Sequence, residues 1–188
     1  MSWFVSILFL PAFIGLLIRV GLATSLDQRF IALGAVMLCL EQSRMAAVDL
    51  HHVAQAKVQI QDCRLDRFHW VTLSTISIEL IGFYAAVRWL GWGSLIVLAS
   101  QVWFHLLAGI ELQPDIDPPF QIRGIRQRLP VLAADVIALG LMGLWIAQSA
   151  ALVAATLLFS ITTTYGLVKY GLPLLRSPMR SDITDQSS

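Results

Sequence analysis

Four ionisable residues interrupt stretches of the chain that are otherwise apolar enough to cross a membrane. They are Glu41, Glu79, His105 and Asp135. An ionisable group in hydrocarbon costs at least ~3 kcal/mol on insertion scales, so such a residue is usually paired or functional. The four residues are therefore a candidate intramembrane polar cluster. Its chemistry would be proton or ion transfer, ligand binding, or hydrogen bonding between helices.

The rise of a helix predicts similar depths for these four residues. Counted at ~1.5 Å per residue from one membrane face, they lie roughly 9 to 16 Å deep. We expect Glu79 to meet His105 across a helical hairpin, with Gln101 as the alternative partner, and Glu41 to pair locally with Arg44. The sequence leaves open whether the cluster ties helices together or forms a proton or ion path with a ligand pocket.

Asp49, His51 and His52 form a second candidate group at the end of an apolar segment. Asp49 and His52 are three positions apart and share one helix face, a spacing that di-metal carboxylate bundles use. Such a site needs about four carboxylates and two histidines, and the chain has no second pair with this spacing. The alternative is an ordinary interfacial helix end, and no cofactor is predicted beyond this possible metal.

Motifs of nucleophilic enzymes and of nucleotide-binding proteins are missing from the sequence. It has no Gly-x-Ser-x-Gly, P-loop, Gly-x-Gly-x-x-Gly or Cys-x-x-Cys. The formal net charge of +1 offers nothing to a nucleic acid partner. Whether the protein is an enzyme is uncertain, and the balance of these observations is against it.

The composition requires a membrane. Of the 188 residues, 57% are hydrophobic and 13% are charged, whereas a soluble domain is about one quarter charged. Such a chain cannot bury its apolar surface in one soluble core, so lipid must solvate part of it. We therefore predict an all-α integral membrane protein.

Helices that span a bilayer need about 20 mostly apolar residues. Five segments meet this requirement: Trp3–Ala23, Phe68–Leu90, Gly93–Leu112, Leu129–Gln148 and Ser149–Tyr170. A sixth, Phe30–Leu50, is apolar only to Leu40, and we expect it to cross as well. The prediction is a polytopic bundle of six helices in residues 1–172, with five helices as the alternative, and a polar, disordered tail in residues 173–188.

Basic residues collect on one side of the six-helix arrangement. That side takes nine of them: Lys57, Arg64, Arg67, Arg123, Arg126, Arg128, Lys169, Arg176 and Arg180. The other side takes Arg29 and Arg88 and has only short links, so the helices read as three hairpins. Because basic residues mark the cytoplasmic side, we expect both termini and both long loops to be cytoplasmic. Within the second loop, Arg123, Arg126 and Arg128 are expected to contact lipid headgroups.

Local patterns in the loops and helices refine this picture. Residues 51–67 keep a helical apolar spacing and should extend the second helix beyond the membrane. Residues 113–128 contain three prolines, which forbid a regular helix at their start and favour a short interfacial turn after it. Gly140 with Gly143, and Ala150 with Ala154, offer small faces that favour close helix packing.

One stretch gives the chain a resemblance to known sequences. Residues Arg67–Pro114, RFHWVTLSTISIELIGFYAAVRWLGWGSLIVLASQVWFHLLAGIELQP, with LPVLAADVIALGL further on, resemble multi-pass membrane proteins of cyanobacteria that carry no assigned activity. The resemblance implies a plasma membrane or thylakoid location and no catalytic residues.

Three functions follow from the sequence, in descending order. The first is a non-enzymatic accessory, assembly or scaffold protein whose partners are the lipid bilayer, other integral membrane proteins or a second copy. The second is a small transporter or a proton- or ion-conducting subunit that uses the intramembrane Glu, His and Asp residues. The third is a metal-dependent membrane enzyme.

Overall fold

The computed structural model describes residues 2–60, 62–112, 120–122 and 124–171. Within them the fold is a helical bundle, as predicted. Its elements are α1 (Ser2–Leu22), α2 (Leu26–Gln59), α3 (Cys63–Arg88), α4 (Leu90–Leu107), β1 (Ile110–Leu112), β2 (Phe120–Ile122), α5 (Ile125–Ile146), α6 (Ala151–Gly166) and a π-helical turn, η1 (Leu167–Gly171). The predicted tail of residues 173–188 lies outside the described part of the chain.

Among the described residues, six helices are long and apolar enough to cross a membrane. Their outer faces carry large apolar side chains that are exposed in the isolated chain, such as Phe4, Trp70, Ile81, Val136 and Leu152. A soluble protein rarely exposes so much apolar surface, whereas lipid solvates it. These features are those of an integral membrane protein.

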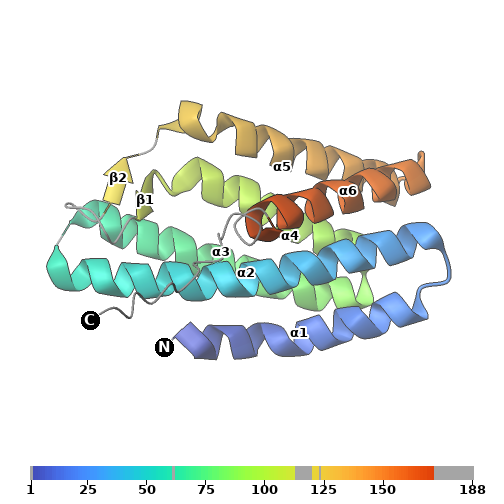
Figure 1. Cartoon of the computed structure of the whole chain (residues 1–188), viewed down its shortest axis with the longest axis horizontal. Helices are drawn as coiled ribbons and strands as arrows, with labels where there is room; N and C mark the ends of the chain where they lie inside the picture. The colour runs from blue at the N-terminus through green and yellow to red at the C-terminus, as the bar shows by residue number, and fades with distance from the viewer. Residues whose placement is uncertain (1, 61, 113–119, 123, 172–188) are drawn as a thin grey trace, which may run out of the picture.

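The helices form three antiparallel hairpins, α1–α2, α3–α4 and α5–α6 (Figure 1). Their three short turns lie together on the right of Figure 1, and we call this the turn end of the bundle. The opposite end holds the start of α1, the α2–α3 link and the β1–β2 pair, and we call it the link end. This is the hairpin arrangement predicted from the uneven loop lengths.

Helix α2 supports most of the bundle. It runs without a break from Leu26 to Gln59, so the segment that the sequence left uncertain is a full helix that also continues past Leu50, as predicted. It contacts α1, α3, α4 and α6. Near the turn end, Nε1 of Trp145 in α5 donates a hydrogen bond to Oδ2 of Asp27 at 2.8 Å. One helix therefore holds neighbours from all three hairpins in place.

The closest packing within the described residues is between α3 and α4. A Cβ atom added to Gly93 would overlap the backbone nitrogen and Cα of Ala86, and one added to Gly82 would lie 2.7 Å from Cγ2 of Val97. By contrast, a Cβ atom added to Gly140 or Gly143 would meet nothing within 4 Å. The prediction that Gly140 and Gly143 mark a close interface is wrong within this chain, since both lie on an open face of α5.

Two segment ends differ from the prediction. Helix α4 ends at Leu107, not at Leu112, because Gly109 adopts a positive φ of 63°, the left-handed conformation that terminates helices. The chain then forms β1, which pairs antiparallel with β2 through Ile110 opposite Ile122. Helix α5 starts at Ile125, before the predicted Leu129, and includes Pro130 near its start, where the missing N–H costs little.

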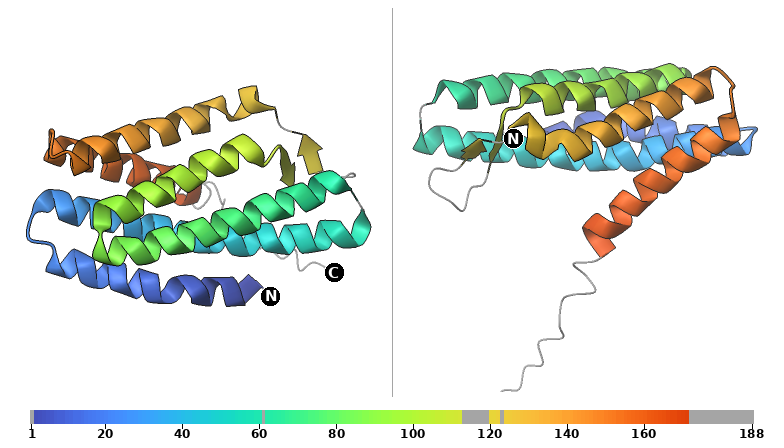
Figure 2. Two further views of the ribbon diagram at one scale, coloured as in Figure 1. Left: turned by 180° about the vertical axis from the view of Figure 1, so that it is seen from behind. Right: turned by 90° about the horizontal axis from the view of Figure 1, so that it is seen from above.

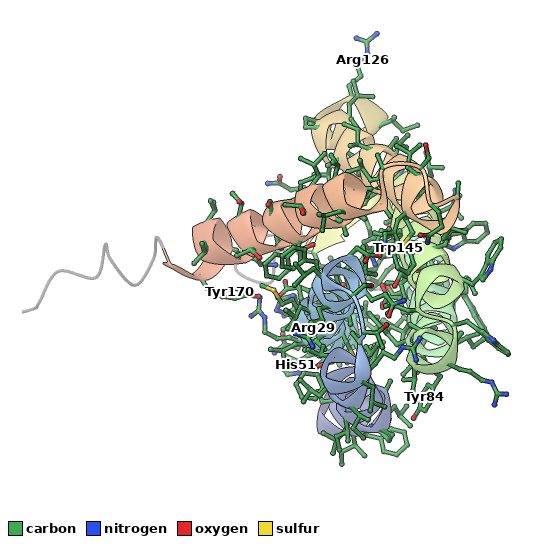
Figure 3. All side chains as sticks on the ribbon, turned by 90° about the vertical axis from the view of Figure 1, so that its right-hand side faces the viewer. Arg29, His51, Tyr84, Arg126, Trp145 and Tyr170 are labelled. Carbon is green, nitrogen blue, oxygen red and sulfur yellow. The ribbon has the colours of Figure 1, made fainter. Side chains whose placement is uncertain are left out.

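Helix α6 departs from the direction of its neighbours. In the right-hand view of Figure 2 and in Figure 3 it diverges from α5 as it runs away from their shared turn. Gln148 and Ala150 in this turn have positive φ values of 56° and 55°. The turn thus sends α6 away from α5 and over the side of α2, to which it packs.

Candidate functional site

The four predicted polar residues line one cavity. It has a volume of about 440 Å³ and lies between α2, α3, α4, α5 and α6. Glu41, Glu79, His105 and Asp135 each contribute to its wall, from four different helices, as do Asp49 and Gln101. The similar depths predicted from the helical rise therefore correspond to a shared space inside the bundle.

Glu79 is the most deeply buried carboxyl group at this cavity, with 2% of its surface exposed. One of its oxygens, Oε1, accepts a hydrogen bond from Nε2 of Gln101 on α4. The Gly82–Val97 contact sets the α3–α4 register and places Glu79 opposite Gln101. His105, one turn nearer the link end, is out of register with Glu79, so Gln101 and not His105 is its partner.

His105 has a different acidic neighbour. Its Nε2 lies 3.5 Å from Oδ2 of Asp135 on α5. Arg128, also on α5, donates to the backbone oxygens of His105 at 3.4 Å and of Ile110 at 2.8 Å. These contacts join α5 to the end of α4 and to β1. The sequence could not pair His105 with Asp135 because helices α4 and α5 are separated by a long loop.

Three side-chain oxygens in the described part of the chain are buried without a hydrogen-bond partner. They are Oγ1 of Thr72, Oγ of Ser94 and Oδ2 of Asp135, and all three residues line the cavity. A buried polar group without a partner costs about 1–3 kcal/mol, and such groups are rare in folded proteins. Their gathering at one cavity indicates a space built for a polar guest.

Glu41 forms the wall of the cavity on the side of α6. It accepts hydrogen bonds from Nζ of Lys169 and from the hydroxyl of Tyr170, both in η1, and Nε of Arg44 lies 3.8 Å away. Nζ of Lys169 also donates to the hydroxyl of Tyr165 at 2.8 Å. The local pair with Arg44 is as predicted, whereas the bonds to η1 were missed because Lys169 is 128 residues away.

A second cavity, of about 870 Å³, lies on the other side of Glu41. His51 and His52 line it, with their ring centroids 6.3 Å apart, while Asp49 lines the first cavity. The helix thus presents Asp49 and the two histidines to different spaces. Among the described residues, no group of three His, Cys, Asp or Glu side chains is placed to hold a metal ion.

The basic residues predicted to contact lipid headgroups have different surroundings. Arg126 is exposed and points away from the bundle in Figure 3. Arg128 faces the end of α4, as described above, and Arg123 lies outside the described residues. Contact of these side chains with headgroups stays a prediction.

The arrangement combines acceptors for a positive charge with an apolar wall. Four carboxyl groups line the first cavity, and no lysine or arginine is among the described residues that line it. Such a space can hold protons, cations or a neutral polar molecule, but it repels anions. Comparison of the chain with models of known protein families gave no match, and searches against curated proteins and solved structures gave none either.

Proposed function

We propose that the chain is an integral membrane protein that moves protons or other small cations through the cavity between α2 and α6. The observation that supports this proposal is the meeting of Glu41, Asp49, Glu79 and Asp135 at one cavity inside the bundle. Carboxyl groups placed inside a membrane domain are typical of proton relays and cation paths.

The length of the cavity fits a path more than a point contact. On α3 its lining runs from Thr72 past Glu79 to Phe83, which corresponds to roughly 16 Å along the helix axis. That is about half of a ~30 Å hydrocarbon core. Thr72 lies toward the link end, and Ser94 lies near the turn end. Polar groups thus accompany a guest over a large part of the crossing.

The accessory or scaffold role, which the sequence places first, stays a prediction. It rests on missing catalytic motifs, and a packing role has no use for a cavity with three unpartnered oxygens. The cavity is the reason to place transport first.

Reconstituted protein provides the test. Proteoliposomes holding a pH-sensitive dye and an imposed potassium diffusion potential should acidify at a rate that depends on the protein. Glu79→Gln keeps the shape and the acceptor for Gln101 but removes the charge, so we expect at least a ~10-fold slower flux. Asp66→Asn is the matched control, since Asp66 pairs with Lys57 on the surface and does not line the cavity. Wild-type flux equal to that of empty vesicles would rule out conduction.

We also propose that the link end faces the cytoplasm of a bacterial plasma membrane, or the corresponding side of a thylakoid. Lys57, Arg64 and Arg67 lie at or beside the α2–α3 link, and Arg126 and Arg128 begin α5. Basic residues are retained on the cytoplasmic side. Single cysteines at positions 2, 60, 125 and 185, in a chain without Cys39 and Cys63, should resist a membrane-impermeant reagent applied from outside. Labelling of position 60 from outside would reverse the orientation.

A further inference from the structure

We infer that the guest of the cavity between α2 and α6 is a small organic cation, a protonated primary or secondary amine on an apolar body. The inference rests on the proposed function, in which this cavity accepts a cation, and it names the class of that cation. Four properties of the described lining support it: unbalanced negative charge, aromatic walls, unpartnered hydroxyl groups and an opening between helices.

The charge of the lining is the first property. Glu41 is paired with Lys169 and Asp135 lies beside His105, but neither Glu79 nor Asp49 forms an ion pair with a described residue. Gln101 satisfies only one oxygen of Glu79. A positively charged guest would balance the negative charge inside the membrane, whereas an anion would face four carboxyl groups.

The walls distinguish an organic cation from a metal ion. Phe30 and Phe159 stack with ring centroids 5.3 Å apart, and both line the cavity, with Phe83 and Phe104 further along it. Metal cations need several oxygen ligands that converge on one point, and the described residues form no such group. A volume of about 440 Å³ instead lies in the range of pockets that hold small organic molecules, and aromatic rings attract ammonium groups.

Two hydroxyl groups favour an amine that carries N–H bonds. Thr72 and Ser94 are 2% and 7% exposed, and the oxygen of each lacks a hydrogen-bond partner while its residue lines the cavity. A hydroxyl oxygen accepts a hydrogen bond from a protonated primary or secondary amine. A quaternary ammonium group has no N–H to donate, so it would leave these oxygens unsatisfied.

The way in points to the same class of guest. Helices α5 and α6 diverge from their shared turn (Figure 2), and the cavity is lined on either side of this divergence by Val131 and Ala134 of α5 and by Ile161 and Thr162 of α6. The opening lies on the apolar, lipid-facing flank of the bundle. An amine with an apolar body concentrates at the membrane interface and can reach this opening sideways.

Binding by the purified full-length chain in detergent tests the inference. Three probes of similar size are titrated by calorimetry: 2-phenylethylammonium, its N,N,N-trimethyl analogue and the anion 3-phenylpropanoate. We expect binding of the primary amine, weaker binding of the quaternary analogue and no binding of the anion. Glu79→Gln and, separately, Asp49→Asn should weaken amine binding by at least ~10-fold, while Asp66→Asn should not change it.

Each outcome decides the inference. Selective amine binding that depends on Glu79 or Asp49 supports it, including when the vesicles described above show no proton flux, in which case only the transport function fails. If the vesicles show flux that depends on Glu79 but no amine binds, the amine class is wrong and the transport function stands. Equal binding of amine and anion, or amine binding that neither cavity variant changes, also overturns the inference.

Discussion

Replacing Gly93 by alanine is expected to cost about 3 kcal/mol or more of unfolding free energy, the largest effect of any single methyl group in the described chain. The added Cβ atom would overlap the backbone nitrogen and Cα of Ala86 and the backbone oxygen of Gly82. A backbone cannot rotate out of the way as a side chain can, so α3 and α4 must separate. Thermal melting in detergent, followed by tryptophan fluorescence, measures the loss.

Two further glycine variants serve as controls. Gly140→Ala adds the same methyl group where nothing lies within 4 Å, so it should melt at or above the wild-type temperature, because alanine is the better helix former by about 1 kcal/mol. Gly82→Ala should lie between the two, since the flexible end of Val97 can give way. A wild-type melting temperature for Gly93→Ala would show that α3 and α4 do not pack this closely.

The second large effect is expected at the ion pair between Glu41 and Lys169. The two side chains are 13% and 27% exposed, so removing one charge leaves the other largely buried. We expect Glu41→Gln or Lys169→Gln to cost up to about 3 kcal/mol, and the double variant to cost clearly less than the sum of the two. Faster hydrogen exchange at the end of α6 and in η1 should accompany each single change, because these segments lose their tie to α2.

Arg44 is the control for this pair. Its side chain is 51% exposed and lies 3.8 Å from Glu41, so Arg44→Gln should cost less than about 1 kcal/mol. Additive costs for Glu41→Gln and Lys169→Gln, with unchanged hydrogen exchange in η1, would mean that the pair does not hold α6 in place.

Much of the fold could be predicted because its signals are local. Segment length and apolar content identify membrane-spanning helices, and three short links against two long ones indicate three hairpins. The apolar spacing after Leu50 predicted the extension of α2, which ends at Gln59. The end of α4 was misplaced because hydropathy does not register the left-handed Gly109, and the β1–β2 pair follows from that early stop.

The site was only half predictable. The rise per residue gives the depth of a side chain, and depth alone was enough to group Glu41, Glu79, His105 and Asp135. Pairing needs the rotation and the register of each helix as well. The register of α3 on α4 depends on Gly82 and Gly93, which look no different in the sequence from Gly140 and Gly143, although these have open surroundings. This is why Glu79 was assigned His105 and not Gln101.

The long separation between Glu41 and Lys169 has a consequence for biosynthesis. A chain emerging from the ribosome delivers α2 to the membrane well before the residue that neutralises Glu41, which follows 128 positions later. Trp145, the partner of Asp27, follows its acid by 118 positions. Helix α2 must therefore remain an unfinished intermediate, with two acidic side chains awaiting partners, until the final hairpin is released. Truncation before that hairpin would leave a product that quality-control proteases recognise.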